Sequence, residues 1–166
     1  WVGISGDIKY GGLGLPLIVT TCVNELLSSA CLSLALNPLM TQGQIDALES
    51  HANEDIKNIF LPKLNSGEWS GTMNLTEPQA GSDVGALRTM ALKDNDGTYR
   101  ITGQKIYISW GDHSLSSNIC HLLLARLPNS PKGTKGISLF LVPKYIPDQN
   151  GNIIEDNSIN TISLEH

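Results

Sequence analysis

The sequence predicts an α+β fold, in which a helical segment is followed by an antiparallel β-sheet or a small β-barrel domain. In the first third of the chain, apolar residues recur with helical spacing. From Trp69 onward, short apolar runs alternate with polar residues and are bounded by turns. Helices and strands do not alternate along the chain, as they would in a βαβ fold. We therefore expect two regions, residues 1–68 and residues 69–166.

The first region is expected to contain three helices. Pro16 suits the start of the first helix, where its missing N–H costs nothing, and Asn37-Pro38 is expected to end that helix. Thr41 and Asn53 are predicted N-caps of the second and third helices. Asn65-Ser66-Gly67 is expected to end the third helix.

The first of these helices lies in the most apolar stretch of the chain, residues 13–40. Polar side chains such as Thr20 and Asn24 interrupt it, and a membrane span needs about 20 mostly apolar residues. We therefore expect a helix surrounded on most sides by protein, and no transmembrane segment.

The second region contains several segments with the two-residue period of β-strands. In Gln104–Trp110, two isoleucines alternate with Tyr107 and Ser109. Asn95-Asp96-Gly97 is typical of a hairpin turn, and Asp148–Gly151 is a second turn. Besides a strand that begins near Trp69, the expected strands are Met90–Lys93, Tyr99–Ile101, Gln104–Trp110, His121–Leu127, Ile137–Val142, Ile153–Ile154 and Ile159–Leu164.

The composition argues against some functions. Eleven Lys and Arg against 16 Asp and Glu give a net charge of −5, and there is no basic stripe to bind nucleic acid. Only 16% of residues are charged, whereas soluble domains average roughly 25%. This deficit predicts a surface that other protein covers. Since the first residue is Trp1 rather than an initiator methionine, we expect a fragment of a larger protein.

The cysteines and histidines show no pattern of a metal site or a thiolate nucleophile. Cys22, Cys31 and Cys120 form no CxxC motif, and an odd number favours structural thiols in a reducing compartment. His113 and His121 lie eight residues apart, without a clear third metal ligand. Cys120 and His121 are neighbours on a predicted strand, where consecutive side chains point to opposite faces.

The loop Met73–Gly85 contains the most distinctive group of polar residues. It follows a predicted strand and contains Thr76, Glu77, Ser82 and Asp83 among glycines and a proline. Such a loop lets backbone N–H groups approach a ligand, while hydroxyls bind a planar heterocycle or a phosphate. It lacks the endings of a P-loop and of a dinucleotide-binding turn. From the residues alone, a solvated turn and a ligand-binding loop both remain open.

Two motifs resemble the signatures of the acyl-CoA dehydrogenase family. The segment Thr76-Glu77-Pro78-x-Ala80-Gly81-Ser82-Asp83 resembles its flavin-binding signature, and Ile101–Ser109 resembles its second signature. Three further stretches, which agree in order, are Tyr10–Gly14, Leu61–Trp69 and Lys135–Pro143. The surroundings of Asp112-His113 and of Asn118–Arg126 resemble the branch that includes 3-methylmercaptopropionyl-CoA dehydrogenase.

The resemblance implies a domain assignment and a cofactor site. Residues 1–68 would be the C-terminal part of the N-terminal helical domain, and residues 69–166 the middle β domain, against which FAD lies. Thr76 would hydrogen-bond the flavin ring, and Ser82 would also face the CoA part of the substrate. The implied cofactor-binding residues are Met73, Leu75, Thr76, Gly81, Ser82, Tyr107, Ile108 and Ser109.

Two positions of the second motif and the residue that follows it depart from the family pattern. Tyr107 stands where the family often has Trp or Phe against the flavin, and Ser109 stands where it usually has Thr. Ser109 keeps the hydroxyl but loses the χ1 restriction of a β-branched residue. Trp110 replaces a small or polar residue.

The activity implied by the resemblance is α,β-desaturation of an acyl-CoA thioester, with hydride transfer to FAD. The family's catalytic carboxylate lies in a C-terminal helical domain, so we expect no catalytic residue in this chain. Glu77 and Asp83 are assigned to hydrogen bonds that shape their loop. His166 stands where the family often has a Glu-His or Glu-Lys pair leading toward that domain, and it also fits the start of a purification tag.

The resemblance also implies the partners of the whole protein. Electron-transferring flavoprotein or a similar acceptor, a homo-oligomeric state, and the bacterial cytoplasm or another reducing compartment are expected. Two alternatives remain: an acyl-CoA oxidase or flavin monooxygenase on the same scaffold, and a non-catalytic binding or assembly module.

Overall fold

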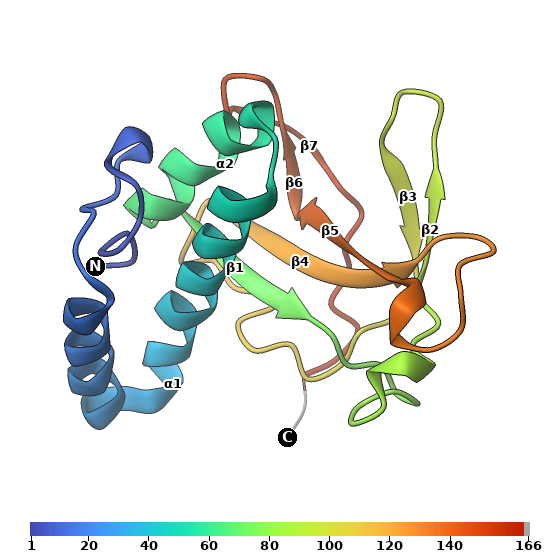
Figure 1. The fold of residues 1–166 in the computed structure, drawn as a ribbon, viewed down its shortest axis with the longest axis horizontal. Helices are drawn as coiled ribbons and strands as arrows, with labels where there is room; N and C mark the ends of the chain where they lie inside the picture. The colour runs from blue at the N-terminus through green and yellow to red at the C-terminus, as the bar shows by residue number, and fades with distance from the viewer. Residues whose placement is uncertain (165–166) are drawn as a thin grey trace.

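Two helices precede the sheet, in agreement with the predicted α+β class (Figure 1). The structure is a computed structural model that describes residues 1–164. His166, which has two interpretations in the sequence, lies outside the described residues. After a short 3₁₀ turn, η1 (Ile8–Tyr10), come α1 (Leu17–His51) and α2 (Glu54–Ser66).

Helix α1 consists of two legs that meet at Cys31, where the backbone is extended, with φ −159° and ψ 97°. The legs lie side by side in Figure 1, and the Asn24 side-chain amide donates to Gln42 Oε1 at 3.0 Å. The prediction that the first helix ends at Asn37-Pro38 is therefore wrong. Pro38 costs the second leg one hydrogen bond, but burial of the apolar residues that follow keeps this leg helical.

Helix α2 has the ends that the sequence predicts. The Asn53 side chain accepts a hydrogen bond from the Ile56 amide at 2.9 Å, which is an N-cap. Gly67 ends the helix with φ 79°, a conformation that glycine adopts without a steric penalty.

The sheet is mixed rather than antiparallel. Its strands are β1 (Trp69–Asn74), β2 (Met90–Lys93), β3 (Tyr99–Thr102), β4 (Asn118–Arg126) and β5 (Ile137–Pro143). Strands β1 and β4 are parallel, because the long connection between them crosses back to the starting end of β1; β2–β3 and β4–β5 are antiparallel. The turns predicted around Gly97 and Gly151 close the β2–β3 hairpin and the separate pair of β6 (Tyr145–Pro147) and β7 (Ile153–Asp156).

Two of the predicted strands, Gln104–Trp110 and Ile159–Leu164, are irregular in the structure. In the first, Tyr107 and Trp110 have φ of 57° and 56°, in the left-handed region that no strand contains. The alternation of isoleucines there reflects partial burial in a loop.

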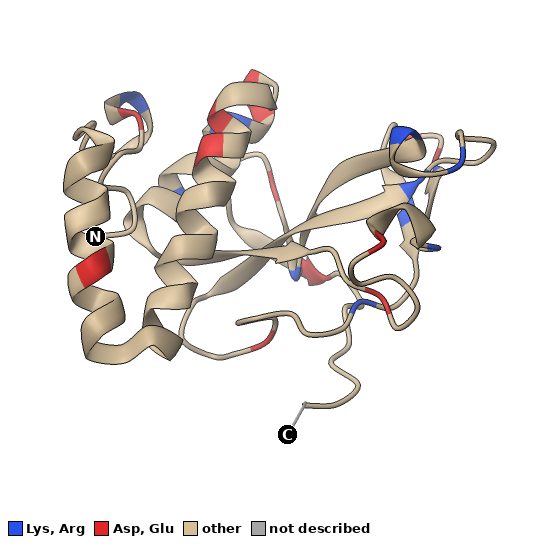
Figure 2. Cartoon of the chain, turned by 60° about the horizontal axis from the view of Figure 1, so that its bottom comes forward, with Lys and Arg blue, Asp and Glu red and all other residues tan. Residues whose placement is uncertain are grey.

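The first leg of α1 is exposed, so the expectation of a helix buried on most sides is wrong within the described residues. Leu17 and Leu26 are 71% and 70% exposed, and the leg carries a single charge (Figure 2). Within residues 1–164, α1 is the one helix with the length and composition of a membrane span. The break at Cys31 limits the first leg to residues 17–30, about 21 Å at 1.5 Å per residue, against a hydrocarbon core about 30 Å thick.

The core lies where both helices pack against β1. Trp69 is 1% exposed, and its ring meets Phe60 edge-on with 5.4 Å between the ring centroids. Ile45 from α1 and Leu61 and Leu64 from α2 belong to the same cluster. This packing holds the start of β1, and therefore the loop that follows it, in place.

We predict that Trp69→Ala lowers the free energy of unfolding by about 3–5 kcal/mol, because it leaves a large cavity in this cluster. Urea unfolding followed by circular dichroism measures the change. Trp1→Ala is the matched control, since Trp1 is 83% exposed, and a loss as large as that of Trp69→Ala would contradict the prediction.

Candidate functional site

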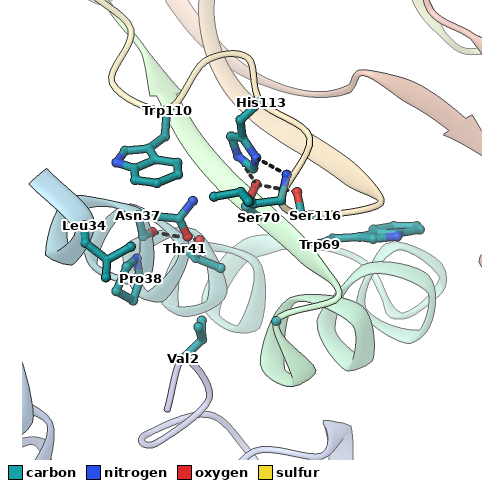
Figure 3. Close-up of a pocket in the computed structure, with 12 residues that line it drawn as sticks. Val2, Leu34, Asn37, Pro38, Thr41, Trp69, Ser70, Trp110, His113 and Ser116 are labelled. Carbon is teal, nitrogen blue, oxygen red and sulfur yellow. Dashed lines mark hydrogen bonds between the residues drawn. The ribbon is translucent and has the colours of Figure 1, made fainter.

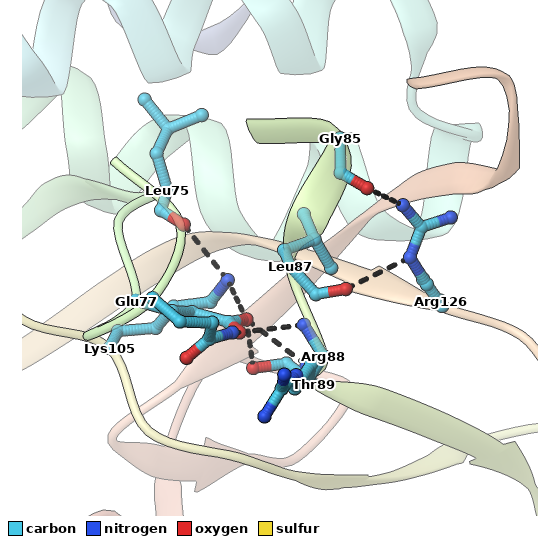
Figure 4. A network of polar contacts seen from close by, with 9 residues as sticks. Leu75, Glu77, Gly85, Leu87, Arg88, Thr89, Lys105 and Arg126 are labelled. Carbon is cyan, nitrogen blue, oxygen red and sulfur yellow. Dashed lines mark hydrogen bonds and ion pairs between the residues drawn. The ribbon is translucent and has the colours of Figure 1, made fainter. Parts of the chain in front are cut away.

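The Glu77 carboxylate organises the loop that follows β1 (Figure 4). It is 3% exposed and accepts hydrogen bonds from the Arg88 amide at 2.6 Å, the Thr89 hydroxyl at 2.6 Å and the Thr89 amide at 3.1 Å. Lys105 Nζ adds an ion pair at 2.8 Å. The expectation that Glu77 shapes the loop is therefore confirmed, and a carboxylate with this many donors is not free to take a substrate proton.

Lys105 joins the two motifs of the sequence. Its side chain is 6% exposed, and Nζ also donates to the Leu75 carbonyl at 3.0 Å. The next amide, that of Ile106, donates to the Thr76 carbonyl at 2.9 Å. The segments 75–77 and 105–106 consequently run side by side, although they are far apart in the chain.

The electrostatics of Glu77 follow from these contacts. Burial by itself would raise the pKa of Glu77, but hydrogen bonds from Lys105, Thr89 and the Arg88 amide outweigh it and lower the pKa to about 2. Glu77 is therefore ionised at neutral pH and stabilises the folded chain in that form.

A second anchor, Arg126, lies at the end of β4. Its guanidinium donates to the carbonyls of Gly85, Leu87, Pro131 and Gly133. The loop after Ser82 is thereby fixed to the connection between β4 and β5. Neither Lys105 nor Arg126 is assigned a role by the sequence motifs; in each case the available signal is a lone cation within an apolar strand-like segment.

The first group of predicted site residues lies around the Glu77 network. Met73 and Thr76 are half-buried, and Leu75 is exposed at the end of β1. Gly81 folds back on Thr76, since a Cβ at this glycine would lie 3.8 Å from Thr76 Cγ2. Ser82 is exposed.

The second group lies on the loop 103–117, not on a strand. Tyr107 is 68% exposed, Ser109 is exposed and Ile108 is half-buried. The Gly111 amide donates to the Ile108 carbonyl at 3.1 Å, which closes a turn here. Tyr107 to Ser109 follow directly on the contact between Ile106 and Thr76, so the structure brings the two groups of predicted residues together.

A cavity of about 200 Å³ borders this loop, between α1 and β1 (Figure 3). Trp110 forms one wall, and its indole N–H donates to the Ser33 carbonyl of α1 at 2.8 Å. The unusual tryptophan at this position therefore ties the loop to the helix. Polar groups of Ser70, His113 and Ser116 line one side, and Leu34, Pro38, Trp69 and Leu115 are among the apolar residues that line the rest.

The two histidines considered as metal ligands bind different hydroxyls of β1. His113 Nε2 lies 3.1 Å from Ser70 Oγ, and His121 Nδ1 lies 2.6 Å from Thr72 Oγ1. Within residues 1–164, no group of three or more His, Cys, Asp or Glu side chains is placed to hold a metal. Burial raises the pKa of the Cys120 thiol, which stays protonated.

Comparison with known proteins identifies the class. The model of the acyl-CoA dehydrogenase N-terminal domain matches residues 1–68, and that of the acyl-CoA dehydrogenase middle domain matches residues 72–159. The chain belongs to the acyl-CoA dehydrogenase family, as its motifs indicate.

Individual relatives agree with this assignment. The chain is 48% identical over all of its 166 residues to 3-methylmercaptopropionyl-CoA dehydrogenase of Ruegeria pomeroyi, and it covers 28% of that protein. It is 29% identical to the structure of butyryl-CoA dehydrogenase from Megasphaera elsdenii, with a TM-score of 0.74, covering 85% of this chain and 37% of that one. The structure of an acyl-CoA dehydrogenase from Bacillus anthracis complexed with FAD is also 29% identical, with a TM-score of 0.70. The match covers 87% of this chain and 24% of that one. The chain thus spans between 24% and 37% of the length of these relatives.

We predict that the stability supplied by Glu77 is lost in acid. Its folded-state pKa of about 2 lies below the ordinary value of 4.5, so the contribution is present above pH 4.5 and falls away as the pH drops toward 2. Between pH 6 and pH 2, the wild type should lose about 3 kcal/mol more unfolding free energy than Glu77→Gln.

Urea unfolding across this pH range measures the difference. Glu155→Gln is the matched control, because Glu155 is exposed, and its pH dependence should equal that of the wild type. Parallel curves for the wild type and Glu77→Gln would contradict the prediction.

Proposed function

We propose that the protein containing this chain is an FAD-dependent acyl-CoA dehydrogenase, which oxidises an acyl-CoA thioester to the α,β-unsaturated product. The observation that carries the proposal is the pairing of the two motifs, Thr76–Asp83 and Ile101–Ser109, through the bond from the Ile106 amide to the Thr76 carbonyl. Membership of the family and the similarity to an enzyme crystallised with FAD support it.

The exposed and half-buried groups beside this pairing fit a flavin. An isoalloxazine ring has flat apolar faces and an edge of alternating donors and acceptors. The hydroxyls of Thr76, Ser82 and Ser109 donate and accept hydrogen bonds, and Gly81 leaves room for close approach to the backbone. Apolar surface comes from Met73, Leu75, Tyr107 and Ile108.

We assign roles to these residues on that basis. Thr76 and Ser109 bind the flavin edge, Tyr107 packs on the ring, and Ser82 also faces the CoA part of the substrate. Bound FAD supplies the two-electron oxidation. The chain's own contribution is orientation, because the buried pair of Glu77 and Lys105 holds the two motifs at a constant separation.

The proton that leaves the substrate goes to a group outside this chain. Glu77 is engaged by its donors, and we assign Asp83, at the exposed turn beside it, to loop shape. We propose that the base lies in the part of the protein beyond the 28% that the chain covers in its Ruegeria relative. Residues 1–166 alone should therefore show no turnover.

The exposed first leg of α1 supports a proposal about the rest of the protein. Apolar side chains such as Leu17 and Leu26 would be covered by further helices or by a second subunit of a homo-oligomer. We place the boundary between the helical and β domains at Trp69, where β1 begins. The free thiols of Cys22 and Cys31 are exposed, which favours a reducing compartment such as the bacterial cytoplasm.

We predict that Thr76→Ala and Ser109→Ala each raise the FAD dissociation constant of the full-length protein about tenfold, because each removes one hydrogen bond to the flavin. Fluorescence titration of the flavin-free protein measures this. Ser114→Ala is the matched control, since Ser114 is exposed on the same loop and is given no contact with the cofactor.

The full-length protein should also carry a flavin whose absorbance is bleached by an acyl-CoA under anaerobic conditions. Purified protein without flavin, and without such bleaching after reconstitution, would overturn the proposed function. We propose electron-transferring flavoprotein or a similar carrier as the acceptor. Rapid reoxidation by O₂, with release of H₂O₂, would instead indicate an acyl-CoA oxidase.

A further inference from the structure

His113 links the loop 103–117 to β1 at the edge of the cavity in Figure 3. Its Nε2 lies 3.1 Å from Ser70 Oγ, and its Nδ1 lies 3.2 Å from the backbone nitrogen of Leu115. Ser70 Oγ also lies 3.0 Å from Ser116 Oγ, and the Ser116 hydroxyl donates to the Asn118 carbonyl at 2.8 Å. One imidazole thus connects the loop with β1 and, through two hydroxyls, with β4.

The direction of these hydrogen bonds follows from the Leu115 amide. A backbone N–H only donates, so His113 Nδ1 must accept and carry no proton. The neutral ring then holds its proton on Nε2 and donates it to Ser70 Oγ. Because the Ser116 hydroxyl donates to Asn118, the Ser70 hydroxyl donates its hydrogen bond to Ser116 Oγ. The histidine therefore does not act as a base that activates Ser70 as a nucleophile.

Contacts on both sides of the segment Tyr107–Ser109 hold it in place. At one end, Lys105 and Ile106 bond to the loop after β1. At the other, Trp110 bonds to α1, Asp112 forms an ion pair with Lys144, and His113 bonds to Ser70. Among these contacts, the hydrogen bond between His113 and Ser70 joins the loop to β1, the strand that ends just before the first motif.

We propose that His113 is a positioning residue for the cofactor, which holds the Tyr107–Ser109 segment in register with β1 by donating to Ser70 and accepting from the Leu115 amide. The cofactor part of this proposal rests on the proposed function, whereas the anchoring of the loop does not. A second proton on the imidazole would occupy Nδ1 and break the bond to Leu115.

The surroundings of His113 favour the neutral ring. Burial lowers the pKa of His113; Asp112 raises it and Lys144 lowers it to smaller extents. The residues of α1 and β1 that line the cavity beside the ring are uncharged: Leu34, Asn37, Pro38, Thr41, Trp69 and Ser70. The folded-state pKa of His113 is below the ordinary 6.5. The hydrogen bonds that anchor the loop through His113 are therefore complete above pH 6.5, and they are lost as the pH falls through the folded-state pKa.

The test compares His113→Gln and His113→Leu in the full-length protein. Glutamine keeps an amide donor that reaches Ser70, whereas leucine fills similar space without a donor. Hydrogen–deuterium exchange of the flavin-free protein reports on peptides from 103–117, and fluorescence titration gives the dissociation constant of FAD. His51→Gln, at an exposed helix end, is the control.

We expect His113→Leu to speed exchange in 103–117 about tenfold and to raise the FAD dissociation constant about tenfold. His113→Gln should retain most of the FAD affinity, and His51→Gln should change neither quantity. Unchanged exchange in His113→Leu overturns the anchor, and faster exchange with unchanged FAD affinity overturns the positioning role. A wild type that binds no FAD overturns the proposed function and the cofactor part of this proposal. Hydrogen–deuterium exchange in 103–117 still decides whether His113 anchors the loop.

A pH series keeps the test decisive if His113→Leu does not fold. The rings of Trp110 and His113 meet edge-on with 5.2 Å between the centroids, and a protonated imidazole quenches indole emission. In the wild type, tryptophan fluorescence should fall and the FAD dissociation constant should rise with one midpoint below pH 6.5. His113→Gln keeps the buried histidine His121 and should lose both changes; if it retains them, the proposal is overturned.

Discussion

The buried ion pair between Glu77 and Lys105 is the contact on which the geometry of the site depends. Removing two charges from water is costly, and such a pair often adds little to net stability. Here the carboxylate also accepts from Arg88 and Thr89, and the ammonium group also donates to Leu75. The Glu77 carboxylate thus accepts from two chain segments, residues 88–89 and Lys105, and moving either segment away would leave the buried charge with fewer donors. The pair therefore selects one arrangement of the loops.

The site separates groups that build it from groups that are available to a ligand. The polar atoms of three side chains form hydrogen bonds within the chain and shape the site: Glu77, Lys105 and Arg126. The hydroxyls of Ser82 and Ser109 lie on exposed turns that these three side chains keep in place. This division is what a large planar cofactor needs, because its binding surface must exist before the cofactor arrives.

Local signals were sufficient for part of the fold. Asn53 and Gly67 mark the two ends of α2, because caps are local interactions. The two motifs are each contiguous in sequence, so the proposed site could be assigned from them without the fold. The break at Cys31 has no proline or glycine to signal it and depends on the packing of the two legs. In Gln104–Trp110, the alternation of a strand occurs in a loop, since a distant acceptor, the Thr76 carbonyl, determines the path of the backbone.

The parallel pairing of β1 with β4 has a consequence for how the chain folds. Partners such as Thr72 and His121 are 49 residues apart, so this pairing has a high contact order and closes slowly. Helix α2 and the β2–β3 hairpin form from nearby residues and are available earlier. During synthesis, β1 leaves the ribosome long before β4 does and remains an unpaired edge in the meantime. The strand that leads into the first motif is thus exposed to aggregation before folding is complete.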